Sequence, residues 1–151
     1  MPDKETLERA EKDKEEGKSP STQAGEFVKE EMEHIREGKH GARSTKQAIA
    51  IGLSKARRAG VDLPPPQSGS TSEETRRKAS RDSARGRSGR RKTSAKRARA
   101  TRKALKREER SAASRKALSR QAHRTAARRG PAARSRSARK AALTRRRTKR
   151  K

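Results

Sequence analysis

The chain has 151 residues, of which 42% are charged, 25% hydrophobic and 1% aromatic, and its formal net charge is +28. This combination of low hydrophobicity and high charge excludes a large buried core. The chain has no cysteine, which excludes disulfides and thiolate chemistry. It also lacks a catalytic dyad and a glycine-rich phosphate loop. We therefore expect no enzyme activity, no cofactor and no small-molecule substrate.

Charge is segregated along the chain. Residues 1–40 carry a net charge of −4, residues 41–63 carry +4, and residues 64–151 carry +28. A segment that repels itself this strongly favours a polyanionic partner, and nucleic acid is the commonest polyanion in a cell. We also expect the acidic residues 1–37 to compete with nucleic acid for the basic segment.

Residues 1–18 predict an acidic, charged helix that ends at Gly17. Opposite charges recur along it at i,i+4 spacing, which stabilises a solvated helix. Leu7 and Ala10 are the only apolar residues within 3–16. We therefore expect it to have no strong packing face and to fray.

Residues 19–63 predict a hairpin of two amphipathic helices, at about 20–37 and 45–59. The first helix has Pro20 in its first turn and ends at Gly38. A unit of this size is at the limit of independent stability, so we expect it to be marginal alone or completed by self-association.

The second helix of this hairpin has signals at both ends. Ser44 and Gln47 form an S-x-x-Q capping box, in which the Ser44 hydroxyl accepts from the Gln47 N–H and Gln47 reaches back to the N–H of Ser44. Gly60 supplies the left-handed residue after the helix. Val61 and Leu63 are then expected to fold back over its last turn.

The remainder of the chain is a linker and a tail. Residues 64–72, rich in Pro, Ser and Gly, predict an extended and flexible linker. Residues 73–151 form a basic, low-complexity tail of Arg, Lys, Ala and Ser. The fold class is therefore all-α with no sheet: a small helical hairpin followed by a long basic tail that is disordered or conditionally helical.

Three helical stretches are expected in the tail. A short helix begins at Ser72, and Ala and Arg favour a second over 94–128 once charge is neutralised. Gly130 and Pro131 break this helix, and another follows over about 132–146.

The density of cations in the tail predicts binding to nucleic-acid phosphates, driven by counterion release. The tail has no aromatic side chain to stack on bases, so we expect no sequence preference. DNA is the expected partner, and RNA or a ribosome is an alternative. The candidate binding residues are Arg76, Arg77, Lys78, Arg90, Arg91, Lys92, Lys96, Arg97, Arg99, Arg102, Lys103, Lys106, Arg107, Arg115, Lys116, Arg128, Arg129, Arg139, Lys140, Arg145, Arg146 and Arg147.

Two further functions compete with tail-mediated binding. The hairpin could serve as a protein-interaction adaptor through Phe27, Val28, Ile49 and Leu53. A helix-turn-helix with its turn at Gly52 is a sharper alternative, but too few residues follow before the next glycine for a recognition helix. We therefore expect one continuous helix.

The histidines predict no metal site. His34 and His40 lie six residues apart, whereas metal ligands on a helix prefer i,i+3 or i,i+4 spacing. We expect both to be exposed to solvent.

The block Lys39-His40-Gly41, followed by S-x-K-Q-A-I-A-I-G-L-S-x-A-R-x-A-G from Ser44 to Gly60, resembles a family of small bacterial proteins of unknown function. Some of its members are labelled DNA-binding or plasmid-stabilisation proteins. The tail is similar in composition to histone H1-like bacterial nucleoid proteins. The resemblance implies a cytoplasmic location at the bacterial nucleoid. The polar N-terminus and the lack of a long apolar run agree with an intracellular protein outside the membrane.

Overall fold

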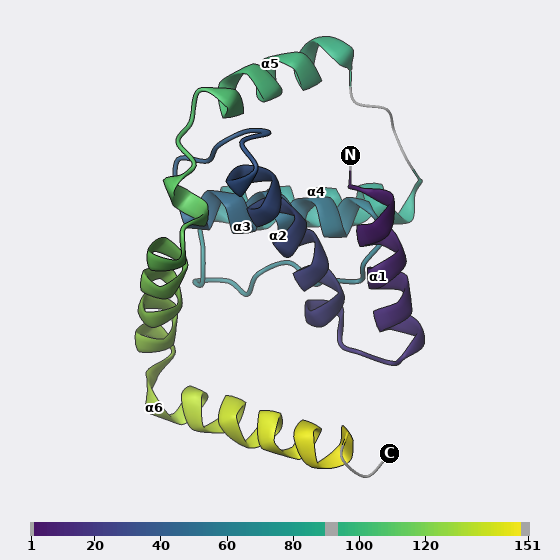
Figure 1. Cartoon of the computed structure of the whole chain (residues 1–151). Coiled ribbons are helices and arrows are strands. Elements are labelled where there is room, and N and C mark those ends of the chain that lie inside the picture. The colour runs from purple at the N-terminus through teal and green to yellow at the C-terminus, as the bar shows by residue number, and fades with distance from the viewer. Residues whose placement is uncertain (1, 90–93, 149–151) are drawn as a thin grey trace. The chain divides into compact units, whose positions relative to one another are not determined.

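The computed structural model describes residues 2–89 and 94–148, and every regular element within these ranges is a helix (Figure 1). The predicted all-α class without a sheet is confirmed for this part of the chain. No helix in it is both long and apolar enough to cross a membrane. The elements are α1 (Lys4–Glu15), α2 (Pro20–Arg36), α3 (Thr45–Arg58), α4 (Glu73–Arg87), α5 (Ala95–Lys106), the 3-10 turn η1 (Ser111–Ala113) and α6 (Arg115–Thr148). Residues up to Ser114 form one compact unit and those from Arg115 a second.

The predicted pair of amphipathic helices is present as α2 and α3, which pack closely on each other. Phe27 and Ile35 of α2 and Ala48 of α3 are buried. The two backbones approach at Gly52, where an added Cβ atom would lie 2.7 Å from the Cα atom of Val28. A glycine in mid-helix normally weakens the helix, and here it permits the close crossing.

The capping signals of α3 are largely confirmed. The Ser44 hydroxyl accepts from the backbone N–H of Gln47 at 3.2 Å. The reciprocal bond differs from the prediction by one residue, because the Gln47 side chain accepts from the N–H of Arg43, at 2.8 Å, and not from that of Ser44. The expected single helix over this segment is also confirmed, since α3 runs without a break from Thr45 to Arg58.

Glycines in the left-handed conformation end the helices as expected. Gly60 has φ 99°, and the N–H of Val61 donates to the carbonyl of Ala56 at 3.1 Å. Gly38 has φ 78°, and the N–H of Lys39 donates to the carbonyl of His34 at 3.0 Å. Both arrangements are Schellman caps, which satisfy carbonyls at the helix end and reverse the chain.

The first helix packs, contrary to the expectation that it frays. Thr6 and Ala10 of α1 are buried against the rest of the unit, with Leu7 beside them. Arg9 reaches α2, where its Nε lies 2.7 Å from a carboxylate oxygen of Glu26. The buried side chains are mostly small, so the hydrophobic pattern underestimates how closely this helix can approach its neighbour.

The compact unit extends past the expected linker, because α4 packs on α3. An added Cβ atom at Gly86 of α4 would overlap the carbonyl oxygen of Arg57. The buried side chain of Arg57 also holds the start of the linker, donating to the carbonyls of Leu63 at 3.3 Å and Pro64 at 3.2 Å. Residues 73–87 therefore belong to the folded unit.

A second segment of the tail returns to the hairpin. The N–H of Gly41 donates to the carbonyl of Leu105 at 2.9 Å, and that of Ala42 to the carbonyl of Glu109 at 3.0 Å. Ala112 and Ala113, in η1, are buried. The helix expected over 94–128 is therefore interrupted between α5 and α6, because these contacts override its helix propensity.

The expected disorder of the tail is not observed in the described residues, which form α4, α5, η1 and α6. Ala, Arg and Lys are good helix formers, and serine hydroxyls cap α4 and α5 at their N-termini. Within α6 the predicted break is confirmed at Gly130, with φ 71° and ψ 169°, followed by Pro131. Figure 1 shows α6 turning between its two halves.

Candidate nucleic-acid interface

Helix α5 is a short basic helix with exposed side chains. Its 12 residues include six Lys or Arg and no Asp or Glu, and none of them is buried. Ser94 caps it by accepting from the N–H of Arg97 at 3.3 Å. Arg99, Lys103 and Lys106 recur at i,i+4 and i,i+7 and therefore share one face.

That face is hollowed by a shallow depression of about 320 Å³. All the side chains that line it are cations: Arg99, Arg102, Lys103, Lys106 and Arg107. Five converging cations with no carboxylate among them form a surface that attracts a phosphate group and repels other cations.

Helix α6, in the second unit, likewise has charged side chains of positive sign only. It contains 13 Lys or Arg and no Asp or Glu. The break at Gly130 divides these cations between its two halves. Each half is an extended basic surface, because cations recur at intervals of at most a few residues along it.

The predicted binding residues lie on three helices. Arg76, Arg77 and Lys78 are on α4; Lys96, Arg97, Arg99, Arg102, Lys103 and Lys106 are on α5, with Arg107 at its C-cap; and Arg115, Lys116, Arg128, Arg129, Arg139, Lys140, Arg145, Arg146 and Arg147 are on α6. Those on α5 and α6 are exposed. Arg90, Arg91 and Lys92 lie outside the described residues.

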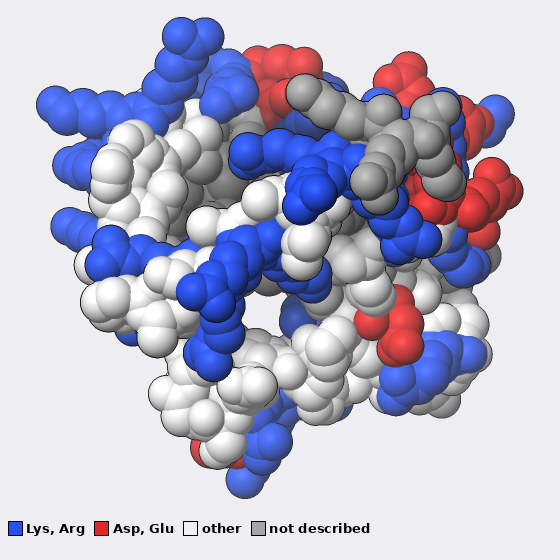
Figure 2. Space-filling model, turned by 90° about the horizontal axis from the view of Figure 1, so that it is seen from below, with Lys and Arg blue, Asp and Glu red and all other residues white. Residues whose placement is uncertain are grey.

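Two of the three predicted residues on α4 have carboxylate partners. Arg76 pairs with Glu73 at 3.0 Å, and Lys78 with Glu74 at 2.6 Å. By contrast, no cation of α5 or α6 forms an ion pair with a carboxylate of the described chain. Figure 2 shows Lys and Arg spread over several parts of one face, whereas Asp and Glu gather in few places. Helices α5 and α6 are therefore the strongest candidates for an anion-binding surface.

The four residues expected to contact a protein partner are not equally accessible. Phe27 is 1% exposed and belongs to the core that joins α1, α2 and α3. Leu53 is half-buried and packs against the same core. Val28 and Ile49 are half-buried. A partner cannot reach Phe27 without opening the unit, so this side chain stabilises the fold.

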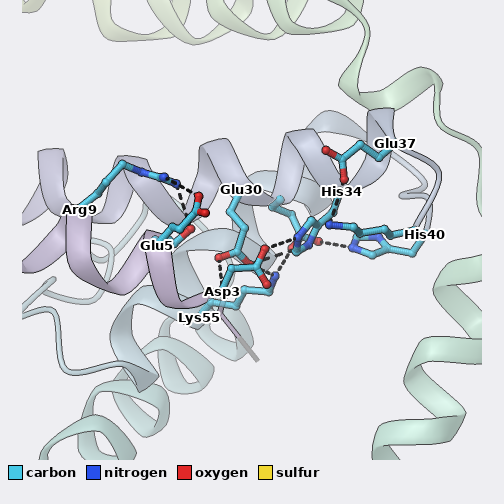
Figure 3. A network of polar contacts seen from close by, with 11 residues as sticks. Asp3, Glu5, Arg9, Glu30, His34, Glu37, His40 and Lys55 are labelled. Atoms are coloured by element: carbon cyan, nitrogen blue, oxygen red, sulfur yellow. Dashed lines mark hydrogen bonds and ion pairs between the residues drawn. The ribbon is translucent and has the colours of Figure 1, made fainter.

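A buried polar network joins α1, α2 and α3 (Figure 3). The Nζ of Lys55 donates to Glu30 Oε1 at 2.8 Å, and the backbone N–H of Asp3 donates to Glu30 Oε2 at 3.0 Å. Burial alone would raise the pKa of Glu30, but these two bonds, the charge of Lys55 and a hydrogen bond from Thr6 together hold that pKa below its usual value. Burial would likewise lower the pKa of Lys55, and its carboxylate partners raise it instead. Both groups therefore stay charged inside the fold.

The histidines belong to this network, contrary to the expectation that they are exposed. The side chains of His34 and His40 are 12% and 15% exposed, and their ring centroids lie 6.1 Å apart. His34 Nε2 lies 2.9 Å from Asp3 Oδ2, and this hydrogen bond lowers the pKa of Asp3. The spacing rule missed the pair because the cap at Gly38 reverses the chain and brings His40 back beside α2.

Comparison with known proteins finds a match for one segment of this chain. No curated protein and no solved structure matches it. Residues 19–67, which contain α2, the turn at Gly38 and α3, match the sequence model of a family described as a family of unknown function, DUF6496.

Proposed function

We propose that the protein binds nucleic acid without sequence preference, through phosphate contacts made by α5 and α6. The observation that carries the proposal is that these two helices hold 19 Lys or Arg, and no Asp or Glu. None of those cations is paired with a carboxylate of the described chain. Binding a polyanion releases its condensed counterions, and this supplies the driving force.

The same helices favour backbone contacts over base reading. Neither contains Phe, Tyr or Trp, and His123 of α6 is their single aromatic ring, so stacking on exposed bases contributes little. Recognition of single-stranded RNA relies on such stacking, which makes duplex DNA the better-fitting polyanion. In the cell, such a protein would associate with the nucleoid.

The test is a fluorescence-anisotropy titration of the full chain with duplexes of two unrelated sequences, at salt concentrations from about 50 to 200 mM. We expect similar affinities for both duplexes and a linear fall of log K with log salt. Replacing Arg99, Lys103 and Lys106 together by Gln should reduce the magnitude of that slope by about 3, one for each lost phosphate contact.

The matched control removes the same charge from an exposed part of the folded unit. Replacing Lys4, Lys12 and Lys14 of α1 by Gln should leave the slope unchanged. A flat salt dependence, a strong preference for one duplex, or an equal loss in both triple variants would contradict the proposal. If ribosomal RNA competes with the labelled duplex more strongly than unlabelled duplex DNA does, RNA is the preferred partner.

A further inference from the structure

We propose that Glu31, His34 and His40 bind a divalent transition-metal ion of the zinc type. One carboxylate oxygen and one nitrogen from each ring lie within 4.8 Å of one another. Glu31 and His34 are three residues apart on α2, and His40 comes from the turn that follows. The site is separate from α5 and α6 and has no part in the proposed phosphate contacts.

The first argument is the state of the Glu31 carboxylate. Glu31 is fully buried. Lys55 Nζ lies 2.7 Å from its Oε2, whereas Oε1 accepts no hydrogen bond within the described residues and has His40 Nε2 3.4 Å away. A buried carboxylate with an unsatisfied oxygen is costly unless a cation is bound to it. Lys55 neutralises one side of the group, and Oε1 remains for a metal.

The second argument is that both histidines have outer partners. The Nε2 of His34 is hydrogen-bonded to Asp3 Oδ2 at 2.9 Å, so Nδ1, which lies 3.9 Å from Glu30 Oε1, is the nitrogen left to bind a metal. The Nδ1 of His40 is 3.1 Å from the carbonyl oxygen of Gly41, which leaves its Nε2 free on the side of Glu31. A metal-binding histidine characteristically donates its other N–H to a carboxylate or a backbone carbonyl, and both forms occur here.

The third argument is charge. Asp3, Glu30 and Glu31 bring three negative charges to the network, and Lys55 brings one positive charge, so the cluster carries −2 when both histidines are neutral. A divalent cation brings this charge to zero. Neutral imidazoles are also the form that binds a metal.

The ligand set selects the class of ion. Two imidazoles and one carboxylate form the ligand set of open zinc sites, which keep a fourth position for water or substrate. Calcium and magnesium prefer oxygen ligands, so they fit poorly. Two ligands held tetrahedrally at about 2.1 Å from zinc lie about 3.4 Å apart. The Glu31 Oε1–His40 Nε2 pair is already at this separation, and all three ligand atoms lie within 4.8 Å of one another.

The experiment is a calorimetric titration of the full chain with Zn²⁺, paired with a Co²⁺ titration followed by visible absorption. We expect one ion per chain, intense d–d bands typical of a four-coordinate site, and a higher melting temperature with metal. His34→Gln and His40→Gln should each abolish these bands. His123→Gln, which removes a histidine from α6, should retain them.

A second pair of variants compares a carboxylate that is hydrogen-bonded to a metal ligand with a nearby carboxylate that is not. Asp3→Asn should weaken Zn²⁺ binding about 10-fold to 100-fold, because Asp3 orients His34. Glu37→Gln, an exposed carboxylate on the same turn, should leave the affinity unchanged.

The wild-type chain supplies a readout that does not depend on whether a variant folds. The imidazole ¹⁵N resonances of His34 and His40 should shift on Zn²⁺ addition, while those of His123 should not. No stoichiometric binding, equal shifts at all three histidines, or full binding by the His34 and His40 variants would overturn the proposal. None of these measurements involves nucleic acid, so a negative result would contradict the metal site and leave the proposed DNA binding unaffected.

Discussion

Gly41 and Glu108 meet backbone to backbone, so closely that a single methyl group at Gly41 would overlap the Glu108 carbonyl oxygen. Gly41 lies in the turn between α2 and α3, and Glu108 lies in the segment that follows α5. Two hydrogen bonds, to Leu105 and Glu109, flank the contact. The basic helix α5 is therefore attached at its C-terminal end to the turn of the hairpin.

Gly41→Ala should release this attachment. The added methyl group cannot be accommodated by a side-chain shift, because the atom that it meets belongs to the backbone. Hydrogen exchange should show faster exchange at the amides of residues 41 and 42, with α2 and α3 still protected. Gly25→Ala is the matched control, since a Cβ atom there meets nothing within 4 Å. It should stabilise α2 by about 0.5–1 kcal/mol.

Gly52→Ala should destabilise the folded unit. The new Cβ atom would lie 2.7 Å from the Cα atom of Val28, and α2 and α3 would have to separate. We expect a loss of about 1–3 kcal/mol in the free energy of unfolding, as for other overpacked cores. Urea denaturation followed by circular dichroism measures this loss. A variant as stable as the wild type would show that the helices do not cross at this residue.

Lys55→Gln should cost more than the removal of any exposed lysine. It leaves Glu30 and Glu31 buried without their shared cation, and breaking a buried ion pair by removing one partner costs about 3–5 kcal/mol. Lys46→Gln, on the exposed side of α3, should change the free energy of unfolding by no more than about 0.5 kcal/mol. Similar losses in both variants would mean that Lys55 is not buried in the network.

Ser44→Ala should lower stability by about 1 kcal/mol, because the Ser44 hydroxyl caps α3. Ser19 precedes α2 in the same position, yet its side chain makes no capping hydrogen bond to the backbone. Ser19→Ala should therefore have a clearly smaller effect in the same thermal or urea unfolding experiment. An inverted order would contradict the capping geometry at both helices.

Sequence reasoning predicts the helices of this protein well because their ends depend on local chemistry. The cap at Ser44 and the left-handed glycines at positions 38 and 60 involve only neighbours in the chain. The break at Gly130 is local in the same sense. Such features are readable from spacing alone.

The packing of the tail on the hairpin was not predictable in this way. It depends on Gly41 and Gly86, where a distant backbone approaches a glycine, and no periodic pattern marks either contact. The burial of Thr6 and Ala10 in α1 was missed for a related reason, since small side chains contribute little to a hydrophobic pattern. Tertiary contacts between residues far apart in sequence decide these features.

The two candidate sites also differ in whether they can be predicted from the sequence. Composition alone predicts the basic residues of α5 and α6 as a phosphate-binding surface, because an exposed cation needs no particular neighbour. Sequence spacing does not reveal the cluster of Glu31, His34 and His40, because the chain reverses direction at Gly38 between the two histidines.

The central claim is that α5 and α6 contact the phosphates while α1, α2 and α3 do not. The most direct measurement is an NMR titration of the ¹⁵N-labelled full chain with duplex DNA. We predict amide and arginine side-chain shifts across residues 95–107 and 115–147, with small changes in α1, α2 and α3. Shifts concentrated in α2 and α3, with α5 and α6 unaffected, would contradict it.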